Sequence, residues 1–284
     1  FCAPGDLVVG NDAATSPASL RGVDSLGRAL EARLVAQTGP ASFRAVLFGE
    51  GDWRTRTEDR PPPPVLGHGD RLRFGVLEAT ILGRSDVSAR LVDLRFERDG
   101  NELWRALYAE GRPVQYSHLA HDLPLWAVQT VYAGRPFAFE MPSAGRPLSW
   151  ETLLALRRKG VGIASLTHAA GLSATGDPAL DRLLPLPERF EIPVATARRV
   201  ARTRAAGGRV IAVGTTVVRA LEGSALATGT VRAGPGETAL RIDERFVPHV
   251  TDGLLSGVHD PSESHFDLLA AFAPPALLRA ALVH

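Results

Sequence analysis

The stretch RVIAVGTTVVRALE, residues 209–222, decides the fold class of this chain. Four hydrophobic residues run into Gly214, Thr215 and Thr216, and a helical repeat that carries Arg219 and Glu222 follows. This pattern predicts a strand, a tight turn and the start of a helix. Backbone N–H groups and threonine hydroxyls at such a turn are placed to bind a polar group, or a threonine simply caps the helix.

The chain around this stretch alternates between helical and strand-like patterns after about residue 134. Alternation of this kind predicts a largely parallel or mixed sheet covered by helices, and therefore an α/β fold. The expected elements are a strand at 161–166 and helices at 150–159, which Ser149 begins, 196–206, 266–272 and 275–282.

The preceding part, residues 21–113, has a different pattern. Short alternating runs such as residues 43–48 and 71–74 are separated by Gly and Pro turns. Alternation with period two predicts strands, so this region is expected to form a small β-barrel or sandwich.

Composition is that of an ordinary globular enzyme, with 32 basic against 31 acidic side chains in 284 residues. Near-zero net charge argues against a strongly basic nucleic-acid-binding protein, although an RNA substrate is permitted. A single cysteine excludes an intrachain disulfide and a multi-cysteine metal site. No apolar run approaches the ~20 residues of a membrane span and no signal pattern is present, so we expect a cytoplasmic protein without a membrane partner. The chain begins at Phe1, and we expect the encoded protein to be longer.

Three further segments occur in a fixed order along the chain. PGDLVVGND occupies residues 4–12, VQTVYA residues 128–133 and DGLLSGVHDP residues 252–261. Together with the Gly214-Thr215-Thr216 turn, this series resembles the S-adenosylmethionine:tRNA ribosyltransferase-isomerase family of queuosine biosynthesis. The resemblance is strongest between residues 208 and 273.

The resemblance implies a mixed α/β fold in which a small β-barrel is inserted into a larger α/β domain. The larger, catalytic domain would comprise residues 1–21 and 114–284, and the inserted barrel residues 22–113. Asn11 and Asp12 would then belong to the larger domain.

The resemblance also implies the reaction and its partners. The ribosyl part of S-adenosylmethionine moves onto a 7-aminomethyl-7-deazaguanine base in tRNA and rearranges to give epoxyqueuosine, with release of adenine and methionine. The sulfonium acidifies the adjacent C5′ protons and is a good leaving group, so the protein supplies a base, a proton and orientation. S-adenosylmethionine is the substrate, tRNA the acceptor, and no metal or redox cofactor is required.

His259 is the candidate for proton transfer, because imidazole titrates near neutrality and its position matches the histidine of the family's Asp-Gly-Leu…His-x-Pro segment. Asp252 of the same segment is expected to orient His259 or to bind ribose hydroxyls. The alternatives are a structural histidine and a turn-forming Asp-Gly pair.

Arg219 lies one helical turn after the threonines, so it is expected to reach a methionine carboxylate or an RNA phosphate held by the turn. A pair with Glu222 within the helix is the alternative. Tyr132 and Gln129 would bond to or stack on a base, or Tyr132 would belong to the core. The substrate-binding candidates are Gly214, Thr215, Thr216, Arg219, Glu222, Asn11, Asp12, Gln129 and Tyr132.

Several family motifs are altered in this chain. Two arginines expected after Asp12 are absent, Pro147 replaces a histidine, and a histidine-rich segment survives only as Leu-Pro-Leu-Pro-Glu at residues 184–188. The histidine expected before residue 168 is displaced to His168. Two alternatives therefore stay open: a homologue that acts on a small-molecule acceptor, and a non-catalytic descendant that binds a nucleoside or RNA.

Overall fold

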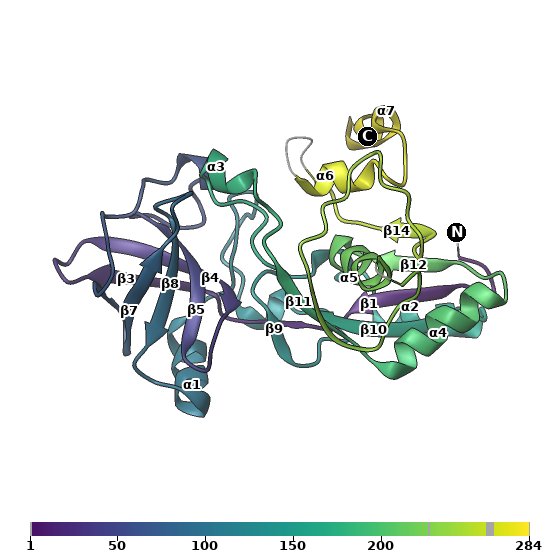
Figure 1. Ribbon diagram of the computed structural model, residues 1–284, viewed down its shortest axis with the longest axis horizontal. Helices are drawn as coiled ribbons and strands as arrows, with labels where there is room; N and C mark the ends of the chain where they lie inside the picture. The colour runs from purple at the N-terminus through teal and green to yellow at the C-terminus, as the bar shows by residue number, and fades with distance from the viewer. Residues whose placement is uncertain (1, 227, 260–263, 284) are drawn as a thin grey trace.

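A computed structural model describes residues 2–226, 228–259 and 264–283. The chain forms a closed β-barrel at one end and a helix-covered sheet at the other (Figure 1). This is the mixed α/β architecture with a barrel that the sequence predicts. None of the helices in these described ranges combines the length and the apolar character needed to cross a bilayer.

Six antiparallel strands close the barrel in the order β3-β4-β5-β8-β7-β6. Its interior is filled by phenylalanines that are no more than 2% exposed, including Phe43, Phe74 and Phe96. At the closing pair, a Cβ on Gly22 would lie 2.1 Å from the carbonyl oxygen of Arg73, so only glycine fits there. The strands are β3 (Ser19–Asp24), β4 (Ala29–Gln37), β5 (Ser42–Phe48), β6 (Arg71–Phe74), β7 (Leu77–Arg84) and β8 (Leu91–Phe96).

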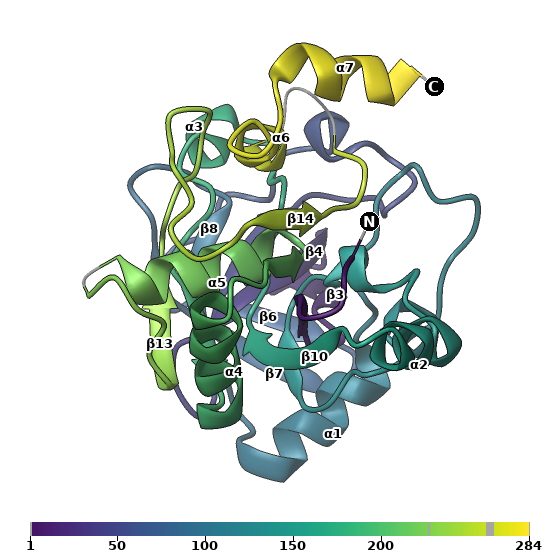
Figure 2. The same ribbon diagram turned by 90° about the vertical axis from the view of Figure 1, so that its right-hand side faces the viewer.

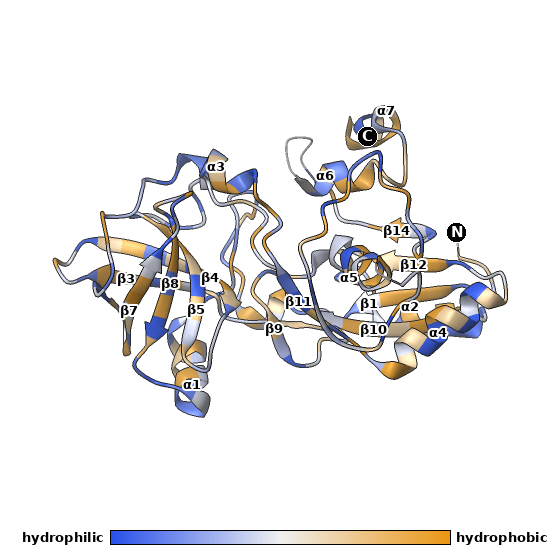
Figure 3. Cartoon of the chain, in the orientation of Figure 1, coloured by the Kyte–Doolittle hydropathy of each residue, from blue (hydrophilic) through white to orange (hydrophobic). Residues whose placement is uncertain are grey.

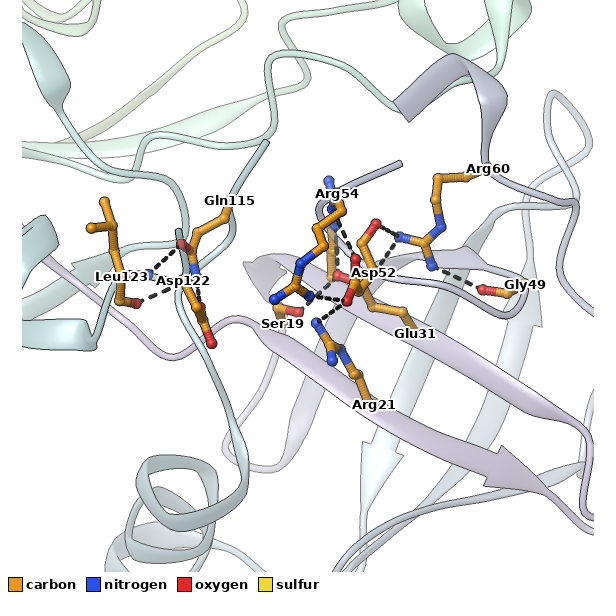
Figure 4. A network of polar contacts seen from close by, with 11 residues as sticks. Ser19, Arg21, Glu31, Gly49, Asp52, Arg54, Arg60, Gln115, Asp122 and Leu123 are labelled. Carbon is orange, nitrogen blue, oxygen red and sulfur yellow. Dashed lines mark hydrogen bonds and ion pairs between the residues drawn. The ribbon is translucent and has the colours of Figure 1, made fainter. Parts of the chain in front are cut away.

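A buried ion cluster covers the outer face of β4 (Figure 4), because Glu31 and Arg33 alternate along the strand with Leu30, Ala32 and Leu34, which belong to the barrel core. The carboxylate of Glu31 accepts hydrogen bonds from Ser19 Oγ at 2.7 Å, Arg33 Nε at 2.8 Å and Arg60 Nη1 at 2.5 Å. Burial opposes ionisation of Glu31, but the charges of Arg33 and Arg60 outweigh it and hold its pKa below the usual value. The guanidinium of Arg60 also donates to the carbonyl of Gly49, which ties the loop after β5 to the cluster.

A helix, α1 (Gly100–Glu110), follows the barrel strands. The prediction of strands alone for residues 21–113 is therefore wrong in this segment. Leu103, Ala106 and Leu107 are its buried residues, and their spacing is that of an amphipathic helix. The exact division of domains at residues 22 and 113 stays a prediction.

The second sheet has the order β13-β11-β10-β1-β12-β14. Strands β1, β10, β12 and β14 are parallel, whereas β11 is antiparallel to both of its neighbours. A short parallel pair of β2 (Ala14–Thr15) and β9 (Pro136–Ala138) lies beside it. The strands of the larger sheet are β1 (Leu7–Asn11), β10 (Gly162–His168), β11 (Glu188–Ile192), β12 (Val210–Val213), β13 (Gly234–Thr238) and β14 (Gly253–Leu255).

Helices cover both faces of this sheet. Successive residues of a strand point to opposite sides, so neighbouring residues contact different helices. Leu7 and Val9 pack with α4 (Val194–Ala205) and α5 (Thr215–Ala225), whereas Val8 packs with α2 (Trp150–Arg158). Figure 2 shows α4 and α5 on one side of β10 and α2 on the other. The hydrophobic colour of β12 in Figure 3 agrees with this burial on both faces.

The predicted helices and strands of this part are confirmed, with boundaries shifted by a few residues. Ser149 caps α2 by accepting a hydrogen bond from the Thr152 N–H at 3.2 Å. The remaining elements are α3 (Pro178–Asp181), α6 (Ser264–Leu269) and α7 (Pro275–Val283), with 3₁₀ turns η1 (Thr57–Asp59), η2 (Leu125–Val128) and η3 (Ser143–Gly145).

Candidate functional site

The parallel strands bring several chain segments to one edge of the six-stranded sheet. Because β1, β10, β12 and β14 run in the same direction, their carboxyl ends meet there. The N–H of Gly214 donates to the carbonyl of Leu255 at 2.8 Å and ties the ends of β12 and β14 together. Open α/β sheets bind their ligands at this edge, which we call the carboxyl edge.

The predicted turn at Gly214 is confirmed as the link between β12 and α5. Gly214 has φ of 93°, a conformation that favours glycine. A Cβ at this position would lie 3.3 Å from Cβ of Ala144, so η3 packs directly on the turn. The hydroxyls are less available than expected, because Thr215 and Thr216 are buried and Asn11 Nδ2 donates to Thr216 Oγ1 at 3.4 Å.

Asn11 connects three elements at this edge. Its Nδ2 also donates to the carbonyl of His168, and its Oδ1 accepts from the N–H groups of His168 and Ala13, at 3.0, 2.9 and 3.1 Å. An amide side chain offers two donors and two acceptor positions, and all four are occupied. Asn11 therefore fixes the arrangement of β1, β10 and α5, and it has no hydrogen-bonding group left for a ligand.

Asp12 has acceptor capacity to spare. Its carboxylate accepts hydrogen bonds from Ser165 Oγ at 2.6 Å and Thr167 Oγ1 at 2.7 Å. A carboxylate has about four acceptor positions. The two hydroxyls orient the group and leave about two positions for a ligand.

Gln129 serves the backbone. Its amide exchanges hydrogen bonds with the N–H and C=O of Thr15, at 2.9 and 3.0 Å, and also donates to the carbonyl of Leu125 at 3.1 Å. The side chain thus extends the pairing of β2 in the manner of a neighbouring strand. In this arrangement the amide of Gln129 is bonded to the backbone and does not point a free group toward a base.

Tyr132 lies against the end of β1. An added Cβ on Gly10 would be 3.2 Å from the tyrosine hydroxyl, and one on Gly145 would be 2.1 Å from it, so both glycines make room for this side chain. Its buried hydroxyl has no hydrogen-bond partner within the described residues. Burial, and then the charge of Asp12, raise the pKa of Tyr132 to about 12, so the phenol stays a donor at neutral pH.

Arg219 pairs with Glu188, at the start of β11, and not with Glu222. Oε2 of Glu188 also lies 3.6 Å from Nε2 of His168, and Oε1 accepts from the N–H of Gly171 at 2.7 Å. Burial lowers the pKa of Arg219 to about 10, which still leaves it charged at neutral pH. Burial and the charge of Arg219 hold the pKa of His168 well below its usual range, so this imidazole is neutral.

Glu222 is a structural anchor, and the expected substrate contact is corrected by its geometry. Its two carboxylate oxygens accept hydrogen bonds from the N–H groups of His249, Val250 and Thr251, at 2.9, 3.0 and 2.8 Å. Glu222 is 1% exposed. It therefore holds the segment before β14 against α5.

Asp252 and His259 lie on either side of β14. Asp252 precedes this strand, and its carboxylate accepts from the N–H of Val210, at the amino end of β12, at 2.8 Å. Asp252 thus sets the register of β12, at the end of the sheet opposite Gly214, and the expectation that it orients His259 is wrong. His259 follows β14 and stacks on His265 of α6, with ring centroids 5.1 Å apart. Residues 260 and 261, the last two of the DGLLSGVHDP segment, lie outside the described residues.

A cavity of about 330 Å³ opens beside α5 and contains the side chain of Arg219. The segment from Leu240 to Asp243 forms one wall, and His265 and Leu268 of α6 form another. Since His265 stacks on His259, the cavity and the proton-transfer candidate are adjacent. The structure therefore brings together Asp12, Tyr132, the Gly214 turn with Arg219, and His259 from four separate segments.

Two acidic residues near the edge were not among the predicted site residues. Glu188 could have been found as the remaining acid of an altered motif. Glu140, between β9 and η3, accepts a hydrogen bond from Ser173 Oγ at 3.0 Å, and the hydroxyls of Ser173 and Tyr116 are 3.2 Å apart. Burial raises the pKa of Glu140 to about 7 against smaller opposing effects of Tyr116 and Ser173. No local pattern in the sequence indicated this, because the burial is created by segments distant in the chain.

Metal-binding side chains were not expected. Within the described ranges, no group of three or more His, Cys, Asp or Glu side chains is placed to hold a metal ion.

Comparison with known proteins gives consistent matches. The family model described as queuosine biosynthesis protein matches residues 1–284. An S-adenosylmethionine:tRNA ribosyltransferase-isomerase from Methylobacterium sp. (strain 4-46) is 34% identical over an alignment of 295 residues, which covers 99% of this chain and 80% of the relative. The enzyme of the same name from Azoarcus sp. (strain BH72) is 34% identical over an alignment of 291 residues, which covers 100% of this chain and 79% of the relative.

The crystal structure of an S-adenosylmethionine tRNA ribosyltransferase from Thermotoga maritima aligns with 99% of this chain and 77% of its own, at 23% identity and a TM-score of 0.46. The family assignment rests on the sequence matches, which extend over the whole chain. This chain belongs to the queuosine biosynthesis protein family, with the S-adenosylmethionine:tRNA ribosyltransferase-isomerases.

Proposed function

We propose that this chain moves the ribosyl group of S-adenosylmethionine onto a 7-aminomethyl-7-deazaguanine base in tRNA and isomerises it, releasing adenine and methionine. The observation that supports this most directly is the gathering of Asp12, Tyr132, the Gly214 turn and Arg219 at one carboxyl edge. The relatives that match over the whole chain are named for this reaction.

Orientation of the ribose is the first task of the site. Asp12 is held by Ser165 and Thr167 and has acceptor positions left for ribose hydroxyls. Tyr132 contributes a hydroxyl donor that is buried and fixed against Gly10. Groups held in place by their neighbours lose little entropy when the substrate binds, and they orient it for reaction.

Proton transfer is the second task. The positive sulfur acidifies the C5′ protons of the ribosyl group, and adenine needs a proton as it leaves. His259 is the proposed donor and acceptor, because it follows β14 at the carboxyl edge and stacks on His265 beside the cavity. His168 does not fit the role of proton donor to adenine, because burial and the charge of Arg219 keep its imidazole neutral.

Recognition of the tRNA backbone is the third task. Helix α4 carries four arginines and no acidic residue, and Arg198, Arg199 and Arg202 are exposed. Its first turn lies beside β10, since Thr196 Oγ1 donates to the carbonyl of Ser165 at 2.6 Å. The arginines follow this first turn toward the amino end of the sheet, where Arg199 donates to the carbonyl of Ile163. Their positive surface is suited to phosphate groups.

Release of adenine and methionine from S-adenosylmethionine tests this function. The purified chain is incubated with S-adenosylmethionine alone, with tRNA bearing the aminomethyl-deazaguanine base, and with the free base, and both products are quantified by chromatography. Release that requires the tRNA supports the proposal. Release with the free base alone would identify a small-molecule acceptor, and S-adenosylmethionine left intact in all three mixtures would contradict catalysis.

A further inference from the structure

The cavity beside α5 combines charges of both signs within a small volume. Arg219 and Arg241 supply positive groups, and Asp243 and Asp267 supply carboxylates, around a space of about 330 Å³. An anion such as a phosphate would face two carboxylates, and a simple cation would face two guanidinium groups. A ligand that carries one charge of each sign at neighbouring atoms matches this lining.

The rest of the lining is apolar. Leu240, Ile242 and Leu268 contribute hydrocarbon surface, and Ile242 and Leu268 are 5% and 3% exposed. Ligand pockets of about 300 Å³ are at the lower end of the usual range. The space thus suits a compact ligand with an apolar side chain, and it is too small for a whole nucleoside with a long substituent.

Arg219 gives the cavity a prepared hydrogen-bond donor. The residue is 3% exposed, and its Nε has no hydrogen-bond partner within the described residues. Glu188 contacts only the other end of the guanidinium, through Nη2. A buried N–H without a partner costs free energy that a ligand carboxylate would recover.

The cavity is also close to the Gly214 turn. Arg219 follows Thr215 by four residues on α5, which corresponds to about one helical turn, or about 5.4 Å along the axis. A ligand with its charged end in the cavity can therefore extend toward the turn and the carboxyl edge.

We infer that this cavity binds the α-amino-acid group of the substrate, with its carboxylate at Arg219 and Arg241 and its ammonium at Asp243 and Asp267. The methylene groups of the amino acid lie against Leu240, Ile242 and Leu268. This assignment rests on the proposed function for the identity of the amino acid, which is the methionine part of S-adenosylmethionine and, after reaction, free methionine.

Calorimetric titration with free L-methionine tests the inference without turnover. Two probes lack one charge each: 3-(methylthio)propylamine has no carboxylate, and 4-(methylthio)butanoate has no ammonium. We expect L-methionine to bind the unmodified chain and each truncated probe to bind about tenfold to a hundredfold more weakly, since each loses charged hydrogen bonds.

Substitutions locate the binding. Arg241→Gln, Asp243→Asn and Asp267→Asn each remove one charge from an exposed or cavity-facing group, and each should weaken methionine binding about tenfold or more. Glu244→Gln is the matched control, because Glu244 is an exposed neighbour in sequence that does not line the cavity. The affinity of the Glu244→Gln variant for methionine should equal that of the unmodified chain.

The outcomes separate this inference from the proposed function. Absence of methionine binding at millimolar concentrations, or equal binding by all three cavity variants, would overturn the inference even if adenine release proceeds. Methionine binding that depends on the cavity residues, in a protein that leaves S-adenosylmethionine intact, would uphold the amino-acid site while the transfer reaction fails.

Discussion

Among single residues, the acidic side chains near the carboxyl edge differ in how many of their acceptor positions are occupied by hydrogen bonds and ion pairs within the protein. Glu222 is held by three backbone N–H groups and Glu188 by Arg219, whereas Asp12 keeps acceptor positions for a ligand. The identity of these residues indicated polar contacts. It could not show which contacts are internal, because saturation depends on partners such as Ser165 and Val250, far away in the sequence.

His259 carries the proposed proton transfer. His259→Ala should retain binding of S-adenosylmethionine and lower turnover by roughly a hundredfold or more, the range for a lost general acid or base. Single-turnover kinetics and calorimetry with the same preparations separate the two effects. His68→Ala is the control, because His68 is exposed and contacts only the barrel carbonyl of Leu82. Normal turnover of the His259 variant would reject the assignment.

The raised pKa of Glu140 predicts that the stability of the chain depends on pH. Burial raises its pKa from 4.5 to about 7 in the folded chain, so the folded state retains a proton that the unfolded state loses. The contribution of this group to the free energy of unfolding is largest below pH 4.5 and falls as the pH rises to about 7. Above that pH it stays constant.

Glu140→Gln keeps the shape and removes the titration. The variant should be more stable than the parent at pH 8, by at most about 3 kcal/mol, and equal to it at about pH 4. Urea unfolding at several pH values measures the difference. A difference that does not change with pH would show that Glu140 titrates normally.

At the scale of elements, local patterns predict most of the α/β part and fail where tertiary contacts decide. The β12–Gly214–α5 unit and α2 follow from hydrophobic periodicity and caps. Helix α1 is not predicted, although its buried residues have helical spacing, because it directly follows a long series of alternating strand patterns. The pairing of Arg219 with β11 could not be predicted, because no local pattern places β11 beside α5.

The Gly214 turn depends on a conformation that other residues adopt with strain. Gly214→Ala should destabilise the chain by about 1–3 kcal/mol, because Gly214 has φ of 93° and ψ of 155°, a combination found essentially only in glycine, with added crowding against Ala144. Gly67→Ala is the control, because no heavy atom lies within 4 Å of the added Cβ there. Urea unfolding compares the two variants, and equal stability would show that the turn carries no strain.

The barrel cluster around Glu31 depends on full charge compensation. Glu31→Gln leaves Arg33 and Arg60 buried without their shared carboxylate and should cost about 3–5 kcal/mol of stability. Asp93→Asn breaks a pair with Arg44 in which both side chains are 40% exposed, so its cost should stay below about 1 kcal/mol. Thermal unfolding measures both losses. Equal losses of stability in the two variants would show that burial does not make the Glu31 cluster more costly to break.

At the scale of the whole molecule, the barrel and the sheet are joined by more than the chain connections. Leu172 and Leu180, which follow β10 in the sequence, belong to the core cluster of the barrel. Ser173 of the same segment bonds to Glu140. The resemblance predicted the barrel and the sheet, but not this return of the chain to the barrel, because residues 169–187 carry no repeated pattern.

The carboxyl edge, the cavity and the basic face of α4 all lie on the sheet part of the molecule. We propose that they act together in transfer of the ribosyl group to tRNA. Mass analysis of nucleosides from tRNA incubated with the chain and S-adenosylmethionine measures this transfer. We expect conversion of the aminomethyl-deazaguanosine nucleoside to epoxyqueuosine. A tRNA that keeps the unmodified base, while the enzyme from Azoarcus converts it in a parallel reaction, would show that this chain does not catalyse the transfer.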